Sequence, residues 1–343
     1  MKAVVWKDFG SIGVCDVPEP TAGSEEVLVR VKAATICMTD VFMIEAGILG
    51  VKPPIIVGHE VSGVIEGAGR KVKDLSCGQL VVLNPPVPCR KCRICKLGIS
   101  HMCPNTRHIG VHAPGGMAEL ITIDYRNAYP VPEGVSAEAA SLAEPFAVCT
   151  EAISQAGGAD GKIVCVFGDG TFGLISSLLL KKQKADEVLL FGHHESRMEL
   201  VKDCGVLTFN SRKVNVEASI KEHSYGYGAQ AIIDTTGAKS VLDNACGYLM
   251  PKGVLVLFAV PEEPPCIDWE KMHIQELAIV GSCRSLDLFP TALESIKENT
   301  GFAERLISRR LSIDEAELGF ELIQKSKDEI IKATIVFESG SEA

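Results

Sequence analysis

The 343-residue sequence lacks long apolar runs. No uninterrupted apolar stretch approaches the roughly 18 residues that a membrane-spanning helix needs. The N-terminus reaches Lys7 and Asp8 after only a few apolar residues, which is too few for the apolar core of a signal peptide. The sequence therefore argues against a membrane-spanning or exported protein, and we expect a cytoplasmic one.

Positive charge is also scarce. The 34 lysine and arginine residues are outnumbered by 44 aspartate and glutamate residues, so the formal net charge is −10. The basic residues are scattered along the chain, and the basic patch of a protein that binds nucleic acid or an anionic membrane is missing. We expect a small-molecule substrate, with neither a nucleic-acid nor a membrane partner.

The remaining composition is typical of a globular protein, with 46% hydrophobic and 23% charged residues. Single hydrophobic cores stop growing at roughly 250 to 300 residues, so a chain of this length predicts two domains. Thiols stay reduced in the cytoplasm. The thirteen cysteines are therefore interpreted as metal ligands, catalytic groups or buried apolar side chains before disulfides.

The pattern of expected strands and helices changes along the chain. Short strand-like runs separated by glycine and proline occupy the first third, at residues 3–6, 26–31, 61–66, 80–83 and 117–123. Residues 136–158 have helical spacing, and from residue 162 apolar runs alternate with helical stretches, a pattern typical of a parallel sheet covered on both faces. The last sixty residues predict helices at 289–298 and 313–325 and a strand at 332–337. The fold class is thus α/β, with a β-rich domain and a parallel-sheet domain.

Four cysteines lie close together in the first domain. Cys89, Cys92, Cys95 and Cys103 have the spacing C-x2-C-x2-C-x7-C, which suits a tetrahedral zinc site with four thiolates. An iron–sulfur cluster is the alternative because Pro104 follows the last cysteine, although the last gap is too long for a ferredoxin pattern; free thiols are the other. Four thiolates leave no open position, so the predicted role of this zinc is structural.

A glycine motif follows the first apolar strand of the second half. Gly168, Gly170 and Gly173 form G-x-G-x-x-G, with Thr171 and Phe172 between the last two, immediately before an apolar helical run. The glycines permit a tight turn and a close approach of the pyrophosphate to the helix N-terminus. This context favours a dinucleotide site over a glycine-rich structural turn.

The end of the next strand bears on the choice of cofactor. An acidic residue is expected there if the adenosine ribose has a free 2′-hydroxyl, but the strand ends at Gly192. His193, His194 and Arg197 follow and suit a 2′-phosphate, so NADP(H) is favoured modestly over NAD(H). Glu195 argues against this preference, and the two histidines would also fit a solvated loop.

Four further residues can form an open metal site. Cys37, His59, Glu60 and Glu144 each have an ordinary structural interpretation when taken singly. Together, a cysteine, a histidine and a carboxylate supply three ligands and leave a fourth position for water or substrate. This is the ligand set that a catalytic zinc requires.

With these motifs the chain resembles the zinc-containing medium-chain dehydrogenase/reductase family, most nearly its polyol (sorbitol) and threonine dehydrogenase branch. The shared motifs span nearly the whole chain. They are C-x-T-D at residues 37–40, G-H-E at 58–60, the four-cysteine lobe, G-G-M-A-E at 115–119, E-P at 144–145 and the glycine motif at 168–173.

The resemblance implies a GroES-like catalytic domain made from residues 1–145 and 283–343, with a Rossmann domain at 146–282. It also implies that Cys37, His59 and Glu144 hold the catalytic zinc, with Glu60 as an alternative or exchanging ligand. Zinc and the nicotinamide cofactor would then exchange a hydride with an alcohol, while Thr39 passes the proton outward unless it only caps a turn. Homodimers or homotetramers are expected by family analogy.

Two departures from the family concern the substrate. Phe42 stands where threonine and sorbitol enzymes commonly have histidine, and Met38 stands where glycine is usual. Arg284 lies where polyol dehydrogenases place an arginine near substrate and cofactor, although a surface ion pair would also explain it. The leading expectation is a secondary alcohol of a polyol, sugar or sugar acid, and a threonine- or amino-alcohol-type enzyme is the alternative. A non-catalytic nucleotide-binding protein and a thiol redox sensor are weaker alternatives.

Overall fold

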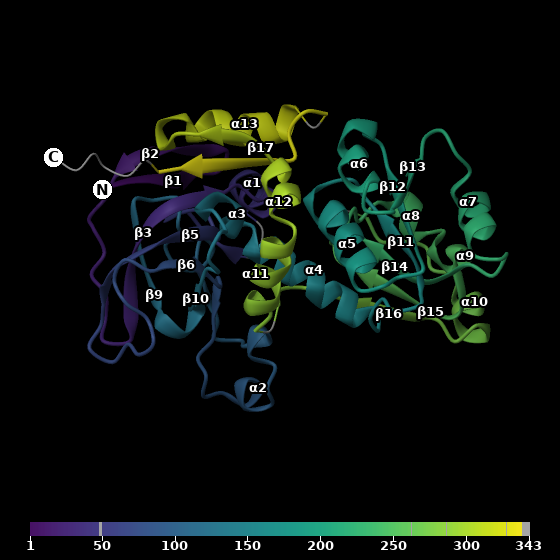
Figure 1. Cartoon of the computed structure of the whole chain (residues 1–343), viewed down its shortest axis with the longest axis horizontal. Helices are drawn as coiled ribbons and strands as arrows, with labels where there is room; N and C mark the ends of the chain where they lie inside the picture. The colour runs from purple at the N-terminus through teal and green to yellow at the C-terminus, as the bar shows by residue number, and fades with distance from the viewer. Residues whose placement is uncertain (48–49, 262, 286, 327, 338–343) are drawn as a thin grey trace. The chain divides into compact units, whose positions relative to one another are not determined.

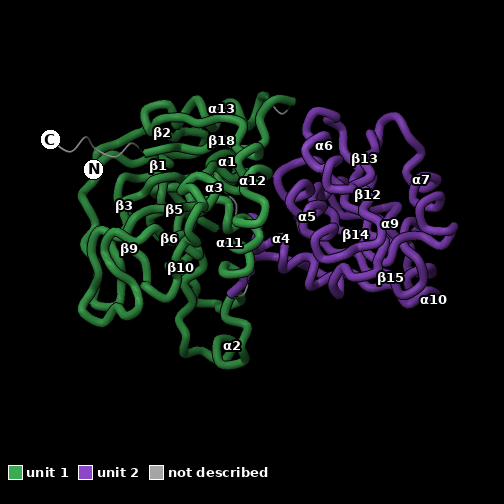
Figure 2. The backbone as a smooth tube through the Cα atoms, viewed as in Figure 1, with its two compact units in different colours: residues 1–144, 289–343 green, residues 145–288 purple. Residues whose placement is uncertain are grey.

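The computed structural model describes all residues except 48–49, 262, 286, 327 and 338–343. The chain divides into two compact units (Figure 2). Unit 1 comprises residues 1–144 and 289–343, and unit 2 comprises residues 145–288. The boundaries therefore fall one and six residues from those expected from the sequence. Among the described residues, no helix is both long and apolar enough to cross a membrane.

Unit 1 is built mainly from β-strands (Figure 1). Its largest sheet has the order β10-β6-β5-β3-β18-β17, with β9 also paired to β3, and a second sheet has the order β2-β1-β4. The strands are β1 Lys2–Asp8, β2 Ser11–Asp16, β3 Glu26–Thr35, β4 Ile55–Ile56, β5 Glu60–Ala68, β6 Leu80–Leu83, β7 Pro86–Val87, β8 Arg107–His108, β9 Leu120–Asp124, β10 Ala128–Pro130, β17 Ile307–Leu311 and β18 Lys332–Val336.

Both parts of the chain contribute to this large sheet, because β18 from the C-terminal part pairs antiparallel with β3. The helices of unit 1 lie around the sheets. They are α1 Met38–Ala46, α2 Arg93–Lys96, α3 Ala137–Ser141, α11 Phe289–Glu298, α12 Thr300–Leu306 and α13 Ala316–Lys325, with short 3-10 turns η2 Ser100–Met102, η3 Tyr125–Asn127 and η4 Ile313–Glu315.

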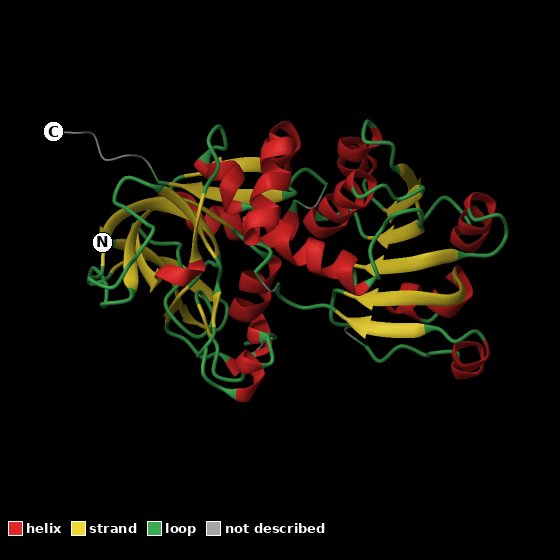
Figure 3. Ribbon diagram, turned by 60° about the horizontal axis from the view of Figure 1, so that its bottom comes forward, coloured by secondary structure: helices red, strands yellow, loops and turns green. Residues whose placement is uncertain are grey.

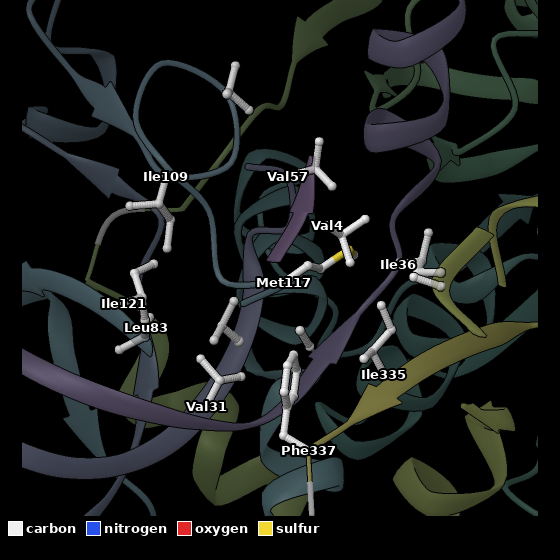
Figure 4. Close-up of a cluster of buried hydrophobic side chains, with 14 of the residues drawn as sticks. Val4, Val31, Ile36, Val57, Leu83, Ile109, Met117, Ile121, Ile335 and Phe337 are labelled. Atoms are coloured by element: carbon white, nitrogen blue, oxygen red, sulfur yellow. The ribbon is translucent and has the colours of Figure 1, made fainter. Parts of the chain in front are cut away.

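The core of unit 1 follows from the alternation of side chains in its strands. In β3, Val27, Val29 and Val31 are buried while Arg30 is exposed, as the two-residue period of a strand requires. The valines pack with residues from both ends of the chain, including Val4 and Ile335, in one cluster of apolar side chains (Figure 4). Burial of this cluster therefore holds the two chain segments of unit 1 together.

Unit 2 contains a parallel sheet with helices along it (Figure 3). The strand order is β13-β12-β11-β14-β15-β16, the 3-2-1-4-5-6 order of a doubly wound dinucleotide-binding fold. Its elements are β11 Ile163–Phe167, α5 Thr171–Lys182, β12 Glu187–Gly192, α6 Glu195–Lys202, β13 Leu207–Asn210, α7 Val216–His223, β14 Ala229–Asp234, α8 Lys239–Leu242, α9 Ala245–Tyr248, β15 Leu249–Leu257, α10 Trp269–Ile274 and β16 Ala278–Gly281. Helix α4, Ala143–Gln155, begins in unit 1 and continues into unit 2.

The pattern of apolar residues explains the sheet of unit 2. All five residues of β11 are buried, as expected for a central strand covered on both faces. The helical segment expected at 136–158 is divided into α3 and α4, and the strand expected at 117–123 begins only at Leu120. Met117 instead packs beside Gly58, where a Cβ would lie 2.5 Å from the Met117 Cγ. The expected α/β class, with a β-rich unit and a parallel-sheet unit, is confirmed.

Candidate functional site

The four clustered cysteines converge in a lobe around α2. The Cys92 and Cys95 sulfurs are 3.5 Å apart, as are those of Cys89 and Cys103, and the Cys92 and Cys103 sulfurs are 3.8 Å apart. A disulfide would need about 2.05 Å, whereas zinc with Zn–S bonds of about 2.3 Å places its four sulfurs about 3.8 Å apart. The spacing fits one tetrahedral ion, and the larger core of an iron–sulfur cluster would hold its thiolates further apart.

Backbone groups of the lobe favour thiolates. The N–H groups of Lys91 and Cys92 lower the pKa of Cys89 to about 6. The N–H group of Asn105 also donates to the Cys103 sulfur, at 3.4 Å. A metal must bind the deprotonated thiol, so these donors prepare the lobe for zinc.

A second group of metal-binding side chains lies in the interior of unit 1. Cys37, His59 and Glu60 are all buried, and one ligand atom from each lies within 4.8 Å of the other two. Cys37 is the N-cap residue of α1 and lies two residues after the end of β3. Glu60 begins β5 and pairs with Thr35, the last residue of β3. Strand pairing thus brings together residues more than twenty positions apart. Sulfur, imidazole and carboxylate are the ligands that zinc takes in open sites.

Asp40 connects two members of this group. Its Oδ2 accepts from the backbone N–H of Cys37 at 3.1 Å, and its Oδ1 accepts from Nδ1 of His59 at 3.1 Å. The Asp40 side chain is fully buried. With Nδ1 engaged, His59 presents Nε2 to a metal, which is the usual arrangement of a carboxylate behind a metal-binding histidine. Burial lowers the pKa of His59, but the neighbouring Asp40 carboxylate raises it by more than burial lowers it. In the metal-free chain the pKa of His59 is therefore well above its usual value.

Besides its place in the metal-binding group, Glu60 has an ion-pair partner, Lys332, which the sequence did not indicate. Lys332 of β18 donates from Nζ to both carboxylate oxygens of Glu60, at 2.5 and 2.7 Å, and to the carbonyl of Ile36 at 3.3 Å. The side chains are 4% and 0% exposed, so neither charge is compensated by water. Lys332 therefore holds the Glu60 carboxylate within reach of the metal group while competing for its oxygens.

Glu144 lies in the first turn of α4, at the end of the first segment of unit 1. It is outside the group of three ligand atoms that approach one another. Burial raises the pKa of its carboxyl to about 7, with His59 lowering it and Glu60 raising it. These electrostatic interactions place Glu144 in the surroundings of the metal group. The structure thus places Glu60 inside the ligand group and Glu144 beside it.

The remaining residues expected near the substrate have different environments. Thr39 is half-buried in the first turn of α1, as is Met38. Phe42 lies on the same helix with 47% of its surface exposed. Arg284 is in unit 2, half-buried, with a left-handed backbone at φ 64°. Phe42 therefore does not line a closed apolar pocket within unit 1.

His108 is a buried residue near the metal group that the sequence analysis missed. Its ring lies edge-on to the His59 ring, with centroids 5.6 Å apart. Its Nδ1 donates to the carbonyl of Ile109 at 3.0 Å, which leaves the tautomer with an acceptor at Nε2. The sequence R-H-I-G around it gave no spacing signal, because its approach to His59 depends on the tertiary fold.

The glycine motif of unit 2 forms the expected turn from strand to helix. A Cβ on Gly173 would lie 1.7 Å from the Gly168 carbonyl, and one on Gly168 would lie 2.3 Å from the Thr235 hydroxyl. Gly170 caps α5 and faces open space. The first turn of α5, which includes Thr171 and Phe172, carries no acidic residue. This cradle and helix N-terminus fit the pyrophosphate of a dinucleotide.

Asp169, between Gly168 and Gly170, bears on whether the end of β12 suits a 2′-phosphate. Its carboxylate binds the backbone N–H groups of His193 and His194 and the His194 ring. Arg197 approaches the same carboxylate at 3.9 Å. Glu195 points elsewhere, with hydrogen bonds to Lys213 and Asn210. The basic residues after Gly192 thus surround an acidic side chain of the chain itself.

Two family models match the chain. The alcohol dehydrogenase GroES-like domain matches residues 23–133, and the zinc-binding dehydrogenase domain matches residues 172–298. The first match contains both metal-binding groups, and the second begins within the glycine motif. The chain is a zinc-containing medium-chain dehydrogenase. This dehydrogenase uses zinc and a nicotinamide dinucleotide to interconvert alcohols and carbonyl compounds.

Similar proteins match the dehydrogenase over nearly its full length. The L-threonine 3-dehydrogenase of Escherichia fergusonii is 29% identical over 92% of this chain and 94% of its own. A zinc-binding dehydrogenase structure from Sinorhizobium meliloti 1021 bound to NADP has a TM-score of 0.90 and 26% identity, covering 98% of this chain and 99% of its own. Galactitol-1-phosphate dehydrogenase from Escherichia coli has the same TM-score and identity, covering 98% and 100%.

Proposed function

We propose that this dehydrogenase oxidises a secondary alcohol of a polyol, sugar or sugar-derived acid and reduces the corresponding ketone. The observation that carries the proposal is the convergence of Cys37, His59 and Glu60 in one buried group. Likeness to galactitol-1-phosphate dehydrogenase supports the substrate class. When bound, zinc at this group polarises the substrate oxygen and the nicotinamide ring accepts or returns the hydride.

The residues of the chain have distinct parts in this reaction. Cys37 and His59 hold the metal with one of the carboxylates of Glu60 or Glu144. Asp40 fixes the His59 ring so that Nε2 faces the ion. The Thr39 hydroxyl is suited to hold the substrate proton, because it lies two residues after Cys37 in the first turn of α1.

The lobe of Cys89, Cys92, Cys95 and Cys103 has a separate part. Its four thiolates complete a closed tetrahedral site, so we assign it a structural zinc. The cytoplasmic location and the homodimer or homotetramer expected from the sequence remain predictions.

A threonine- or amino-alcohol-type reaction is the second candidate. Its support is the 29% identity to an L-threonine 3-dehydrogenase. Phe42 counts against it, because the aromatic ring offers no proton-relay group where that branch commonly has histidine.

An activity screen with matched metal analysis tests both candidates. Polyols, sugars, sugar acids and threonine are offered with NAD⁺ and with NADP⁺ to the wild type, to Cys37→Ser and to Cys89→Ser. We expect polyol-class activity and two zinc ions per chain in the wild type, and one zinc without activity in Cys37→Ser. Turnover of threonine alone would support the second candidate, and wild-type zinc content in Cys37→Ser would refute the assigned metal site.

A further inference from the structure

The side chain of Asp169 is directed to the end of β12 rather than away from the protein. Its Oδ2 accepts from the backbone N–H groups of His193 and His194 at 2.5 and 2.6 Å, and its Oδ1 accepts from the His194 Nδ1 at 2.9 Å. The side chain is 8% exposed. The carboxylate therefore has a fixed position at the carboxyl end of the sheet, where dinucleotides bind in this fold.

Gly192 is explained by the same carboxylate. A Cβ on Gly192 would lie 2.5 Å from Asp169 Oδ2 and 2.6 Å from the Asp169 Cβ. A side chain at the end of β12 is thus excluded because Asp169 already fills that space. In NAD-binding members of this fold, an acidic side chain near this strand end binds the adenosine ribose hydroxyls. Here the glycine loop, rather than the strand, brings a carboxylate to that place.

We propose that Asp169 is the residue that binds the adenosine ribose and makes this dehydrogenase prefer NAD(H) over NADP(H). The proposal rests on the dinucleotide function and extends it to the choice between the two cofactors. It reverses the modest preference for NADP(H) expected from the sequence, which considered Gly192, His193 and Arg197 without Asp169.

Hydrogen bonding and charge both favour NAD(H). A carboxylate oxygen has two lone pairs and can accept two hydrogen bonds. The Asp169 Oδ1 accepts one from the His194 ring N–H, so it can accept another from a ribose hydroxyl. A 2′-phosphate would instead bring a second anion against Asp169. The His194 ring and the Arg197 guanidinium already face the carboxylate. The rival groups for a phosphate are His193 and the exposed Arg212.

Binding measurements without any alcohol test the proposal. NADH and NADPH are titrated into the full-length zinc-loaded enzyme, and nucleotide fluorescence gives each Kd. We expect the wild type to bind NADH about tenfold or more tighter than NADPH, the scale of one charge-assisted hydrogen bond. Asp169→Asn keeps the shape without the charge, so the ratio of the two Kd values should move toward one through tighter NADPH binding.

A relocation variant provides the matched control. In Asp169→Ser combined with Gly192→Asp, the carboxylate moves from the loop to the strand end, and the preference for NADH should return. Gly192→Asp alone should weaken both nucleotides because its side chain collides with Asp169. Thermal melting verifies that each variant folds.

Three outcomes would overturn the proposal. They are wild-type binding of NADPH as tight as that of NADH, an unchanged ratio in Asp169→Asn, and binding of neither nucleotide. Because no alcohol is present, an error in the proposed substrate class would alter the activity screen and leave these binding results unchanged.

Discussion

At the scale of single residues, the most consequential contact is the buried ion pair of Lys332 and Glu60. The Lys332 ammonium and the Glu60 carboxylate are both buried, and the Lys332 Nζ lies 2.5 Å from the Glu60 Oε1. Burial alone would lower the pKa of Lys332, but the charges of Glu60 and Cys37 raise it above its usual value. A raised lysine pKa means that folding favours the charged form, so the Lys332 ammonium stabilises the fold at neutral pH. This stabilisation is lost only as the pH rises through the raised pKa.

Replacing Lys332 by methionine should therefore destabilise unit 1 strongly. The change leaves the Glu60 carboxylate buried without its cation, which costs about 3–5 kcal/mol. Urea unfolding measures the loss, and the double variant Lys332→Met with Glu60→Gln should recover most of it. If zinc binds Glu60 directly, the loss should be smaller in zinc-loaded than in zinc-stripped protein. A loss below about 1 kcal/mol in both forms would show that the pair is not a structural requirement.

Residue roles differ in how far the sequence predicts them. Cys89, Cys92, Cys95 and Cys103 are close in sequence, so their spacing alone predicts a shared ion. Cys37 and His59 are far apart in the sequence, so they were joined by their ligand chemistry and by resemblance to a family, whereas strand pairing brings them together in the fold. Lys332 carried no signal, since a lone lysine in a strand is usually exposed.

Asp169 and His108 were missed for a similar reason. Asp169 stands at a variable position of the glycine motif, and its effect depends on where the next strand ends. His108 reaches His59 only in the folded chain. Contacts between distant residues are therefore the part of the site that composition and spacing do not contain.

At the scale of elements, the four-cysteine lobe differs from the sheets around it. None of residues 87–102, all of which the structure describes, is buried, and α2 contributes no core residue. A segment without its own apolar core depends on its metal for order. The sheets of unit 1 instead have the large apolar cluster shown in Figure 4.

Loss of the lobe zinc should consequently loosen the lobe and leave the sheets intact. Cys95→Ser should remove one zinc per chain and speed amide hydrogen exchange across residues 88–107, with β3 and β5 unchanged. Hydrogen exchange with mass spectrometry measures this, and Cys77→Ser, at an exposed cysteine outside the lobe, is the control. Unchanged exchange across the lobe after zinc loss would contradict the assigned structural role.

The sequence predicted the apolar central strands of unit 2 but not β2, β13 or β17. Apolar runs such as β11 are determined by local composition and were found where expected. The second boundary lies six residues later than expected, between Leu288 and Phe289. Gly281 ends β16, and Ser282 and Ser285 follow it, so this segment resembles a linker. The compactness of the fold, which the sequence does not show, assigns the segment to unit 2.

At the scale of the whole molecule, each unit contains an apolar cluster of its own among the residues that the structure describes, so we expect the two units to be stabilised separately. One cluster surrounds β3 and the other surrounds β11. The metal ligands belong to the first unit, and the glycine motif belongs to the second. Zinc should therefore stabilise unit 1 against unfolding, and the dinucleotide should stabilise unit 2.

Calorimetry should resolve two unfolding transitions with distinct responses. NADH at about 100 times its Kd should stabilise the transition of unit 2 by about 2.7 kcal/mol, whereas a zinc chelator should lower that of unit 1. Hydrogen exchange in β11 and β3 assigns each transition. A single transition shifted alike by both reagents would show that the two units unfold as one.

The pairing of β18 with β3 also bears on biosynthesis. Unit 1 begins at the first residue but lacks β18, and hence the ammonium that faces Glu60, until Lys332 has been synthesised. By then all residues of unit 2 have left the peptidyl-transferase centre of the ribosome. Domains usually fold in the order of their synthesis, but here the inserted unit is complete first. A ribosome stalled before the codon for Lys332 would thus carry a finished nucleotide-binding unit and an unfinished metal-binding one.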